Sequence, residues 1–336
     1  MCKKGSVLLI SLWIAAILAL FTLGLAHRAS LNLKIVRNQK NRLKAYYLAK
    51  AGVNKAIALA QEDSEDSETK HYDSTLECGV SLGGKEPKEI FSESSPDTNE
   101  GFQIGFYNDG DEFIYGMNDE ESKINVASEC LVTLFEKKGV EGGIELAQTV
   151  HNWINQESSL ANLGSLEIPK KEPLDIPEEL ILITEYFFSS KNILDAKEKA
   201  KEQYEKFKDF ITIYGDGKIN VNTAPKESLE TVASAYSLQN NQQIDTAAIV
   251  GRIIELRDSP QRKYYKNIAE LQNDIQEDQN LDNEQKGFFT SILLPLLKCR
   301  SDYLKISSKG YVGNIIKRIN VVYDRLAKKT VYWHEN

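Results

Sequence analysis

The sequence predicts an α+β protein with a long N-terminal helix, a small antiparallel β-sheet and a large all-helical domain inserted into that sheet. Three observations predict this fold. An uncharged apolar run over residues 6–26 continues into a helical pattern, and no proline occurs before Pro87. Strand-like alternation occurs at two distant places, over residues 102–115 and again after residue 299. Helical periodicity dominates the long stretch between them, and 336 residues are enough for two or three domains.

The N-terminal apolar run predicts a membrane span. Residues 6–26 carry no charge over 21 positions. As a helix they would extend about 31 Å, enough to cross the hydrocarbon core of a bilayer. A secretory signal peptide would have a shorter apolar core followed by a small-residue cleavage site. Here apolar positions continue at helical spacing as far as Ile57, so we expect one helix over residues 6–61, first transmembrane and then amphipathic. An ordinary single-pass anchor on an unrelated exported domain would have the same span.

Charge is divided unevenly along the chain. The formal net charge is -8, yet no Asp or Glu precedes Glu62, whereas ten Lys and Arg residues do. The remainder therefore has 31 basic against 49 acidic residues, a formal charge of -18. Such an acidic body repels nucleic acid, so we expect no nucleic-acid partner. Lys3 and Lys4 favour a cytoplasmic N-terminus, whereas the basic residues after Ala26 favour the reverse orientation.

Residues 62–121 are expected to form a linker followed by the first strands. Residues 62–99 are rich in Ser, Glu, Asp and Lys, which is typical of a linker. Residues 102–106 and 113–115 flank a turn signal at residues 108–111, which predicts a hairpin. Residues 79–83 match the GxSxG nucleophile pattern. They lack the buried strand and the packed helix that this pattern needs, so a glycine-rich turn is expected there.

Six carboxylates near this hairpin are candidates for a calcium site. They lack the spacing of an EF-hand, and solvated turns use the same residue types, so the sequence leaves calcium open. The candidates are Asp109, Asp111, Glu112, Asp119, Glu120 and Glu121.

Residues 122–298 form the predicted helical insertion, and residues 299–336 return to strand patterning. Inside the insertion, the motif at residues 123–127 (KINVA) is echoed at residues 218–225 (KINVNTAP), each time before an amphipathic helix. After residue 299, Leu304 and Ile306 alternate with polar partners. An isolated hairpin is only marginally stable, so we expect the early and the late strands to share one sheet around the insertion.

Neither catalysis nor a thiol-based metal site is predicted. The four histidines are scattered, and the chain has no HExxH motif and no glycine-rich phosphate loop, so we do not expect an enzyme. Cys78, Cys130 and Cys299 show no metal-ligand spacing. One disulfide with one free thiol, or three buried thiols, both agree with the sequence.

The N-terminal layout resembles type IV pilin-like proteins. A short basic leader ends at Gly5, an unbroken apolar run follows, and residues 45–58 (AYYLAKAGVNKAIA) look like the helix continuation of that family. The resemblance implies a leader over residues 1–5 and cleavage by prepilin peptidase between Gly5 and Ser6. Family members usually begin the mature chain with Phe or Met rather than Ser6. Most also carry Glu at the fifth mature position, where this chain has Ile10.

The residue at position 10 distinguishes one family among the pilin-like proteins. A Glu there is thought to neutralise the amino terminus of a neighbouring subunit, and an unpaired charge in hydrocarbon costs several kcal/mol. Ile10, the motif GDGKINVNTAP at residues 215–225 and the closing Tyr332–Trp333 together resemble the minor pseudopilin K family of type II secretion systems. This resemblance implies a pilin-like fold whose inserted helical domain is SAM-like.

The resemblance also implies a place and partners. It places the chain in the bacterial inner membrane as a single-pass protein, with a cytoplasmic N-terminus and a periplasmic body, at the tip of a pseudopilus. The implied partners are minor pseudopilins I and J, the major pseudopilin and prepilin peptidase. We expect the long helix to pack against partner helices through Leu43, Tyr46, Tyr47 and Val53.

Two related classes remain as alternatives. A minor pilin of a type IV pilus or of a DNA-uptake system shares the leader and the long helix. The KINVNTAP motif also resembles the helix-hairpin-helix modules of DNA-binding proteins. The stretch SLQNNQQID that follows its helix has neither the hairpin glycines nor the basic face by which such modules bind phosphate.

We expect prepilin peptidase to remove residues 1–5 and leave Ser6 as the first residue of the mature protein. Intact-mass spectrometry of the membrane-extracted chain, from cells with and without the peptidase, measures this directly. The substitution Gly5→Leu should block processing. A chain that retains its first five residues in the presence of the peptidase would contradict the prepilin assignment.

Overall fold

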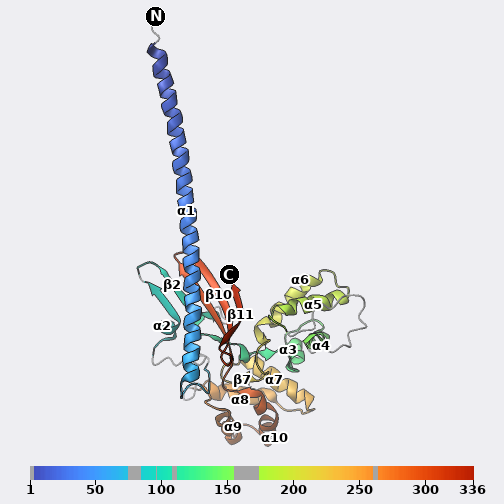
Figure 1. Ribbon diagram of the computed structural model, residues 1–336. Coiled ribbons are helices and arrows are strands. Elements are labelled where there is room, and N and C mark those ends of the chain that lie inside the picture. The colour runs from blue at the N-terminus through green and yellow to red at the C-terminus, as the bar shows by residue number, and fades with distance from the viewer. Residues whose placement is uncertain (1–3, 75–84, 96, 108–111, 155–173, 260–263) are drawn as a thin grey trace.

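The computed structural model describes residues 4–74, 85–95, 97–107, 112–154, 174–259 and 264–336. Helix α1 (Lys4–Glu65) has 62 residues and projects far from the rest of the molecule (Figure 1). Its mean hydropathy reaches 2.4 over a window long and apolar enough to cross a membrane, and none of that window is buried within the protein. The long helix is therefore confirmed, and it ends at Glu65 rather than at the expected residue 61.

One antiparallel sheet contains both the early and the late strands. Its order is β1-β2-β9-β10-β11, with β3 paired to β2 and β4 paired to β9. The short helix α2 (Pro87–Phe91) precedes it. The strands are β1 (Ser92–Ser95), β2 (Glu100–Tyr107), β3 (Phe113–Tyr115), β4 (Asn118–Asp119), β9 (Tyr303–Val312), β10 (Ile315–Asp324) and β11 (Lys329–Glu335). Because β2 pairs directly with β9, the predicted insertion into a sheet is confirmed.

The second half of α1 packs on one face of this sheet through small side chains. Ala45, Ala49, Ala56 and Ala60 are fully buried there, and they face the buried side of β9. At Gly310 a Cβ would lie 2.1 Å from the carbonyl oxygen of Ala45 and 2.3 Å from the amide nitrogen of Ala49. The backbones of helix and strand therefore touch at a position that only glycine can occupy.

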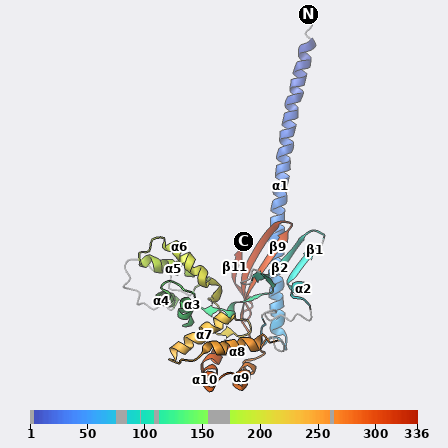
Figure 2. The same ribbon diagram turned by 180° about the vertical axis from the view of Figure 1, so that it is seen from behind.

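The insertion lies between β4 and β9 and has its own hydrophobic core. Figures 1 and 2 both place it beside the end of α1 that is far from the N-terminus. Its helices are α3 (Cys130–Lys137), α4 (Gly143–Ile154), α5 (Glu179–Ser190), α6 (Ala196–Phe207), α7 (Lys226–Gln239), α8 (Thr246–Arg257), α9 (Ile268–Glu277) and α10 (Asn283–Phe288). Short helical turns occur at Glu120–Ser122, Lys208–Phe210, Phe289–Leu293 and Leu294–Leu296.

The insertion is not purely helical, which corrects the prediction. Strand β5 (Ile124–Asn125) pairs in parallel with β6 (Ile211–Thr212), and β7 (Ile219–Asn220) pairs in parallel with β8 (Leu297–Lys298). Strands of two residues are too short to produce the alternation by which strands are recognised in a sequence.

These strand pairs explain the repeated KIN motif. The amide of Val126 donates to the carbonyl of Thr212 at 2.9 Å, and the amide of Val221 donates to that of Lys298 at 2.8 Å. In both copies the Asn side-chain oxygen accepts from the amide two residues later, at 2.9 Å for Asn125 and 3.1 Å for Asn220. In its described residues, the insertion thus consists of two successive halves that share one plan, in which a strand is followed by four α-helices and a parallel closing strand.

We expect Gly310→Ala to destabilise the fold by about 1–3 kcal/mol, because its methyl group would force α1 away from β9. Gly251→Ala in α8 is the matched control, since a Cβ there meets nothing within 4 Å. It should be neutral or stabilising by up to about 1 kcal/mol. Urea unfolding of both variants measures the difference. Equal free energies of unfolding for the two variants would show that α1 and β9 are not tightly packed at Gly310.

Candidate functional site

The apolar half of α1 exposes its side chains along its whole described length. Ile10 is 56% exposed and lies among exposed Leu, Ile, Trp and Phe residues that extend to Leu25. Gly5 and Ser6 belong to the first turns of α1, and their side chains lie outside the description. Exposed apolar surface of this extent is compatible with a bilayer or with neighbouring helices.

The four residues expected to pack on partner helices do not share one face, which corrects the prediction. Val53 is fully buried in the core between α1 and the sheet. Tyr46 packs against the same core, and its hydroxyl bonds to the Glu335 carboxylate at 3.1 Å. Leu43 and Tyr47 are 57% and 58% exposed.

The helical period explains this division. Leu43 lies two residues before the buried Ala45 and Tyr47 lies two residues after it, so both side chains point about 160° away from Ala45. The side of α1 that bears Leu43 and Tyr47 is therefore the side turned away from the sheet, and it is open to a neighbouring chain.

A buried ionic junction fixes the sheet to the insertion. The Arg325 side chain is fully buried, and its guanidinium pairs with Asp63 at 2.5 Å and with Asp73 at 2.8 Å. It also donates to the carbonyl of Ser301 at 2.9 Å. Burial raises the pKa of Asp63 to about 6, and the positive charge of Arg325 opposes that rise. The junction thus joins the end of α1, the segment after it and the chain leaving the insertion.

Asp119 is the second centre of the junction. Its carboxylate accepts hydrogen bonds from Asn220 at 3.0 Å, from Ser301 at 2.6 Å and from the Thr223 hydroxyl. Burial, together with the nearby negative charge of Asp73, raises the pKa of Asp119 to about 7. Asn220 and Asn222 are fully buried as well, so the KINVNTAP motif serves the interior of this protein.

Three of the predicted calcium ligands take part in structural contacts. Besides Asp119, Glu120 pairs with Lys123 at 2.8 Å, and Glu121 pairs with Lys298 at 2.5 Å. Asp109 and Asp111 lie outside the described residues. Among the residues that the structure describes, no group of three or more His, Cys, Asp or Glu side chains could hold a metal ion.

The two cysteines that the structure describes, and the histidine of the insertion, also lie in structural surroundings. Cys130 and Cys299 are buried free thiols, and burial raises their pKa values to about 11 and about 12. Cys78 lies outside the described residues. His151 bonds through Nε2 to the carbonyl oxygen of Ser128 at 3.1 Å. These thiols are unreactive at neutral pH, because a thiolate is the reactive form.

Sequence reasoning missed Asp63, Asp73 and Arg325. Asp63 lies in the last turn of a long helix, Asp73 lies in a polar linker and Arg325 follows a strand, where charged residues are ordinarily solvated. Arg325 lies 252 residues after Asp73 and 262 residues after Asp63, and no local sequence pattern relates positions so far apart.

No family model and no curated protein sequence matches the chain. Among solved structures it is similar to a chain in the crystal structure of the GspK-GspI-GspJ complex from the enterotoxigenic Escherichia coli type 2 secretion system. The chain shares that pilin-like fold. The similarity covers 90% of this chain and 99% of the other, with a TM-score of 0.55 and 12% sequence identity. At this identity the comparison establishes the fold, including the helical insertion.

We expect Arg325→Met to destabilise the protein by about 3–5 kcal/mol, because it leaves two buried carboxylates without their cation. Lys328→Met, which breaks an exposed ion pair with Glu65, should cost less than about 1 kcal/mol. Urea unfolding at pH 5 and pH 8 measures both variants.

The pH dependence adds a second readout. The pKa of Asp63 is higher in the folded chain than in the unfolded chain, so its contribution to stability is lost as pH rises from about 4 through about 6. Removing Arg325 takes away a positive charge that lowers the pKa of Asp63, so the loss of stability in Arg325→Met should be larger at pH 8 than at pH 5. The same loss at both pH values would contradict the assigned ion pairs.

Proposed function

We propose that this protein is a minor pseudopilin of a type II secretion system that caps the tip of the pseudopilus and helps to start its assembly. The resulting apparatus would export folded proteins across the outer membrane. The observation that carries the proposal is the similarity to a chain of the GspK-GspI-GspJ complex over nearly the full length of both chains. That length includes the helical insertion, which a simple pilin sheet would lack.

The proposed membrane placement follows from α1. The apolar start of the helix would lie in the bacterial inner membrane, with the N-terminus cytoplasmic and the sheet and insertion periplasmic. Prepilin peptidase would remove the leader, and the new terminus would be methylated as in pilin-like proteins. Subunit assembly requires no catalytic site, so the proposed role is not enzymatic.

Two features favour the tip over the shaft. Ile10 supplies no carboxylate to neutralise the amino terminus of a neighbouring subunit in the apolar layer. The insertion lies beside the end of α1 far from the N-terminus (Figures 1 and 2). Bulk at that end would obstruct a further subunit stacked on it, whereas the open side of α1 stays available to the subunits beside and below.

The proposed partners are minor pseudopilins I and J and the major pseudopilin. Leu43 and Tyr47 supply exposed apolar surface on the side of α1 turned away from the sheet, which suits contact with partner helices. Minor pilins of type IV pili share the leader and the long helix, so a genetic experiment is needed to identify the system.

Deleting the gene should abolish secretion of the exported proteins, and normal secretion would remove the proposed role.

We expect Leu43→Glu to weaken co-purification with minor pseudopilins I and J while leaving the fold intact, because a carboxylate would be buried against a partner helix. Asn38→Glu is the matched control, since it introduces the same charge on exposed α1 about 140° around the helix. Affinity capture followed by quantitative mass spectrometry measures the complex. Equal recovery with both variants would exclude this side of α1 from the interface.

The tip position has its own test. An epitope inserted after Gln243, in the exposed α7–α8 connection, can be imaged with gold-labelled antibody on pseudopili lengthened by overproducing the major subunit. Label is expected at one end of each filament. Label repeated along the shaft would overturn the tip position.

A further inference from the structure

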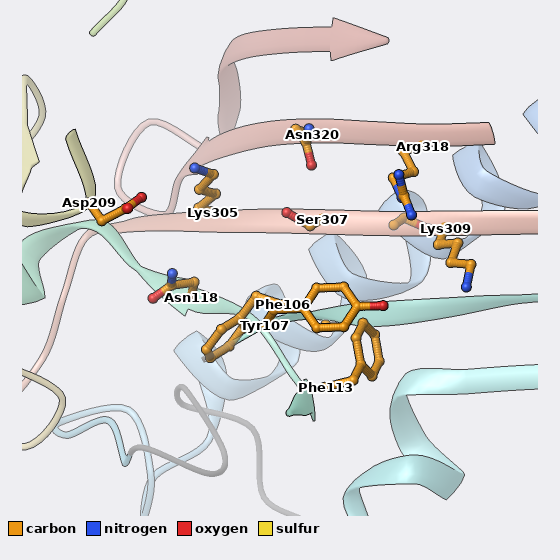
Figure 3. Close-up of a pocket in the computed structure, with 12 residues that line it drawn as sticks. Phe106, Tyr107, Phe113, Asn118, Asp209, Lys305, Ser307, Lys309, Arg318 and Asn320 are labelled. Carbon is orange, nitrogen blue, oxygen red and sulfur yellow. The ribbon is translucent and has the colours of Figure 1, made fainter. Parts of the chain in front are cut away.

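A cleft opens on the face of the sheet opposite α1 (Figure 3). Its volume is about 420 Å³, and β2, β3, β9 and β10 supply most of its lining, with Asp209 from the insertion at one end. Residues of β9 that face the cleft alternate with those that face α1. The cleft is therefore separate from the side of α1 proposed above for assembly.

Three cations line this cleft without an ion-pair partner among the described residues. Lys309 of β9 and Arg318 of β10 are direct cross-strand partners, and Lys305 lies four residues before Lys309. Like charges placed directly opposite each other destabilise an antiparallel pair. The body of the protein is strongly acidic, yet these two cations lie directly opposite each other, so an anion from outside the described chain would relieve their repulsion.

The acidic residues near the cleft lie toward the Lys305 end. Asp209 is at that end in Figure 3, and Asp209 and Glu120 act on Lys305 electrostatically. Burial lowers the pKa of Lys305, and the positive charge of Lys123 lowers it further. The Lys309–Arg318 end is thus the stronger electrostatic attractor for an incoming anion.

Aromatic rings line the side of the cleft formed by β2 and β3. Tyr107 and Phe113 meet edge to face with ring centroids 5.2 Å apart, and Tyr107 is 57% exposed. Ser307 and Asn320 lie between the cationic ends and offer hydrogen-bonding groups. The lining therefore combines charge, hydrogen bonding and apolar contact, as a polypeptide ligand requires.

The spacing of the cations selects the kind of anion. Four residues of strand separate Lys305 from Lys309, about 13 Å, which is too far for one small anion to bridge. In an extended polypeptide, every second side chain lies on the same side, so carboxylates at alternate positions repeat about every 7 Å.

We propose that this cleft binds an extended acidic segment of a partner polypeptide, with one carboxylate at the Lys309–Arg318 pair, a second carboxylate at Lys305 and an apolar side chain against Tyr107 and Phe113. The inference rests on the geometry and charge of the cleft, and it does not depend on the pseudopilin role. An acidic segment that docks here would reach the protein from the sheet face, while α1 contacts other chains.

The test uses the full chain in nanodiscs of zwitterionic lipid and a short fluorescein-labelled peptide with Glu at every second position and one Phe. Anisotropy titration at low salt should show binding that weakens as salt is added. The double variant Lys309→Gln/Arg318→Gln should bind the peptide at least about tenfold more weakly. Its melting temperature should equal or exceed that of the parent, because the cross-strand repulsion is gone.

The matched control is Lys317→Gln/Lys329→Gln, which removes the same charge from the same sheet outside the cleft. Its peptide affinity should stay within about twofold of the parent. Equal losses in both double variants would show nonspecific charge attraction and overturn the site. Failure of the parent chain to bind the peptide would overturn it as well. Tripolyphosphate that competes as well as unlabelled peptide would show a small-anion site and overturn the polypeptide assignment.

Discussion

The Arg325 guanidinium holds three parts of the chain together at one buried point. It pairs with Asp63 at the end of α1 and with Asp73 beyond it, and it bonds to the backbone of Ser301 where the chain leaves the insertion. Each ion loses several kcal/mol of hydration on burial, and the opposite charges must compensate for it. That requirement makes the junction cooperative, because loss of any one partner leaves the others unsatisfied.

The contact between α1 and the sheet has a different physical basis. Alanine side chains and Gly310 let the helix and strand backbones approach closely, and the larger side chains of Val53, Phe102 and Ile306 fill the core beside this contact. A narrow contact of this kind buries one side of the helix. The opposite side, with Leu43 and Tyr47, keeps the freedom to meet other chains.

Much of the architecture could be predicted from the sequence, because long elements carry periodic signals. The helix beginning near Ser6 and the strands around Ile306 and Val321 extend far enough for apolar periods of 3.6 and 2 to be recognised. The two-residue strands β5 to β8 could not be predicted, although β5 and β7 each lie within a copy of the repeated KIN motif. The burial of Val53 and the role of Arg325 could not be predicted either, since both depend on which distant strands and carboxylates pack against them.

The meeting of Asp119 with Ser301 has a consequence for how this architecture can vary. These residues lie where the chain enters and leaves the insertion. Their hydrogen bond of 2.6 Å closes the chain between them into one loop that is attached to the sheet at both ends. The entropy of closing a loop grows only logarithmically with its length, and doubling the length adds about 0.6 kcal/mol. A second half built like the first therefore adds little closure entropy, because it brings its own closing strand and packs into the same hydrophobic core. Duplication within the loop can therefore enlarge such a protein with only a small increase in the free energy of loop closure, while the sheet and the long helix stay unchanged.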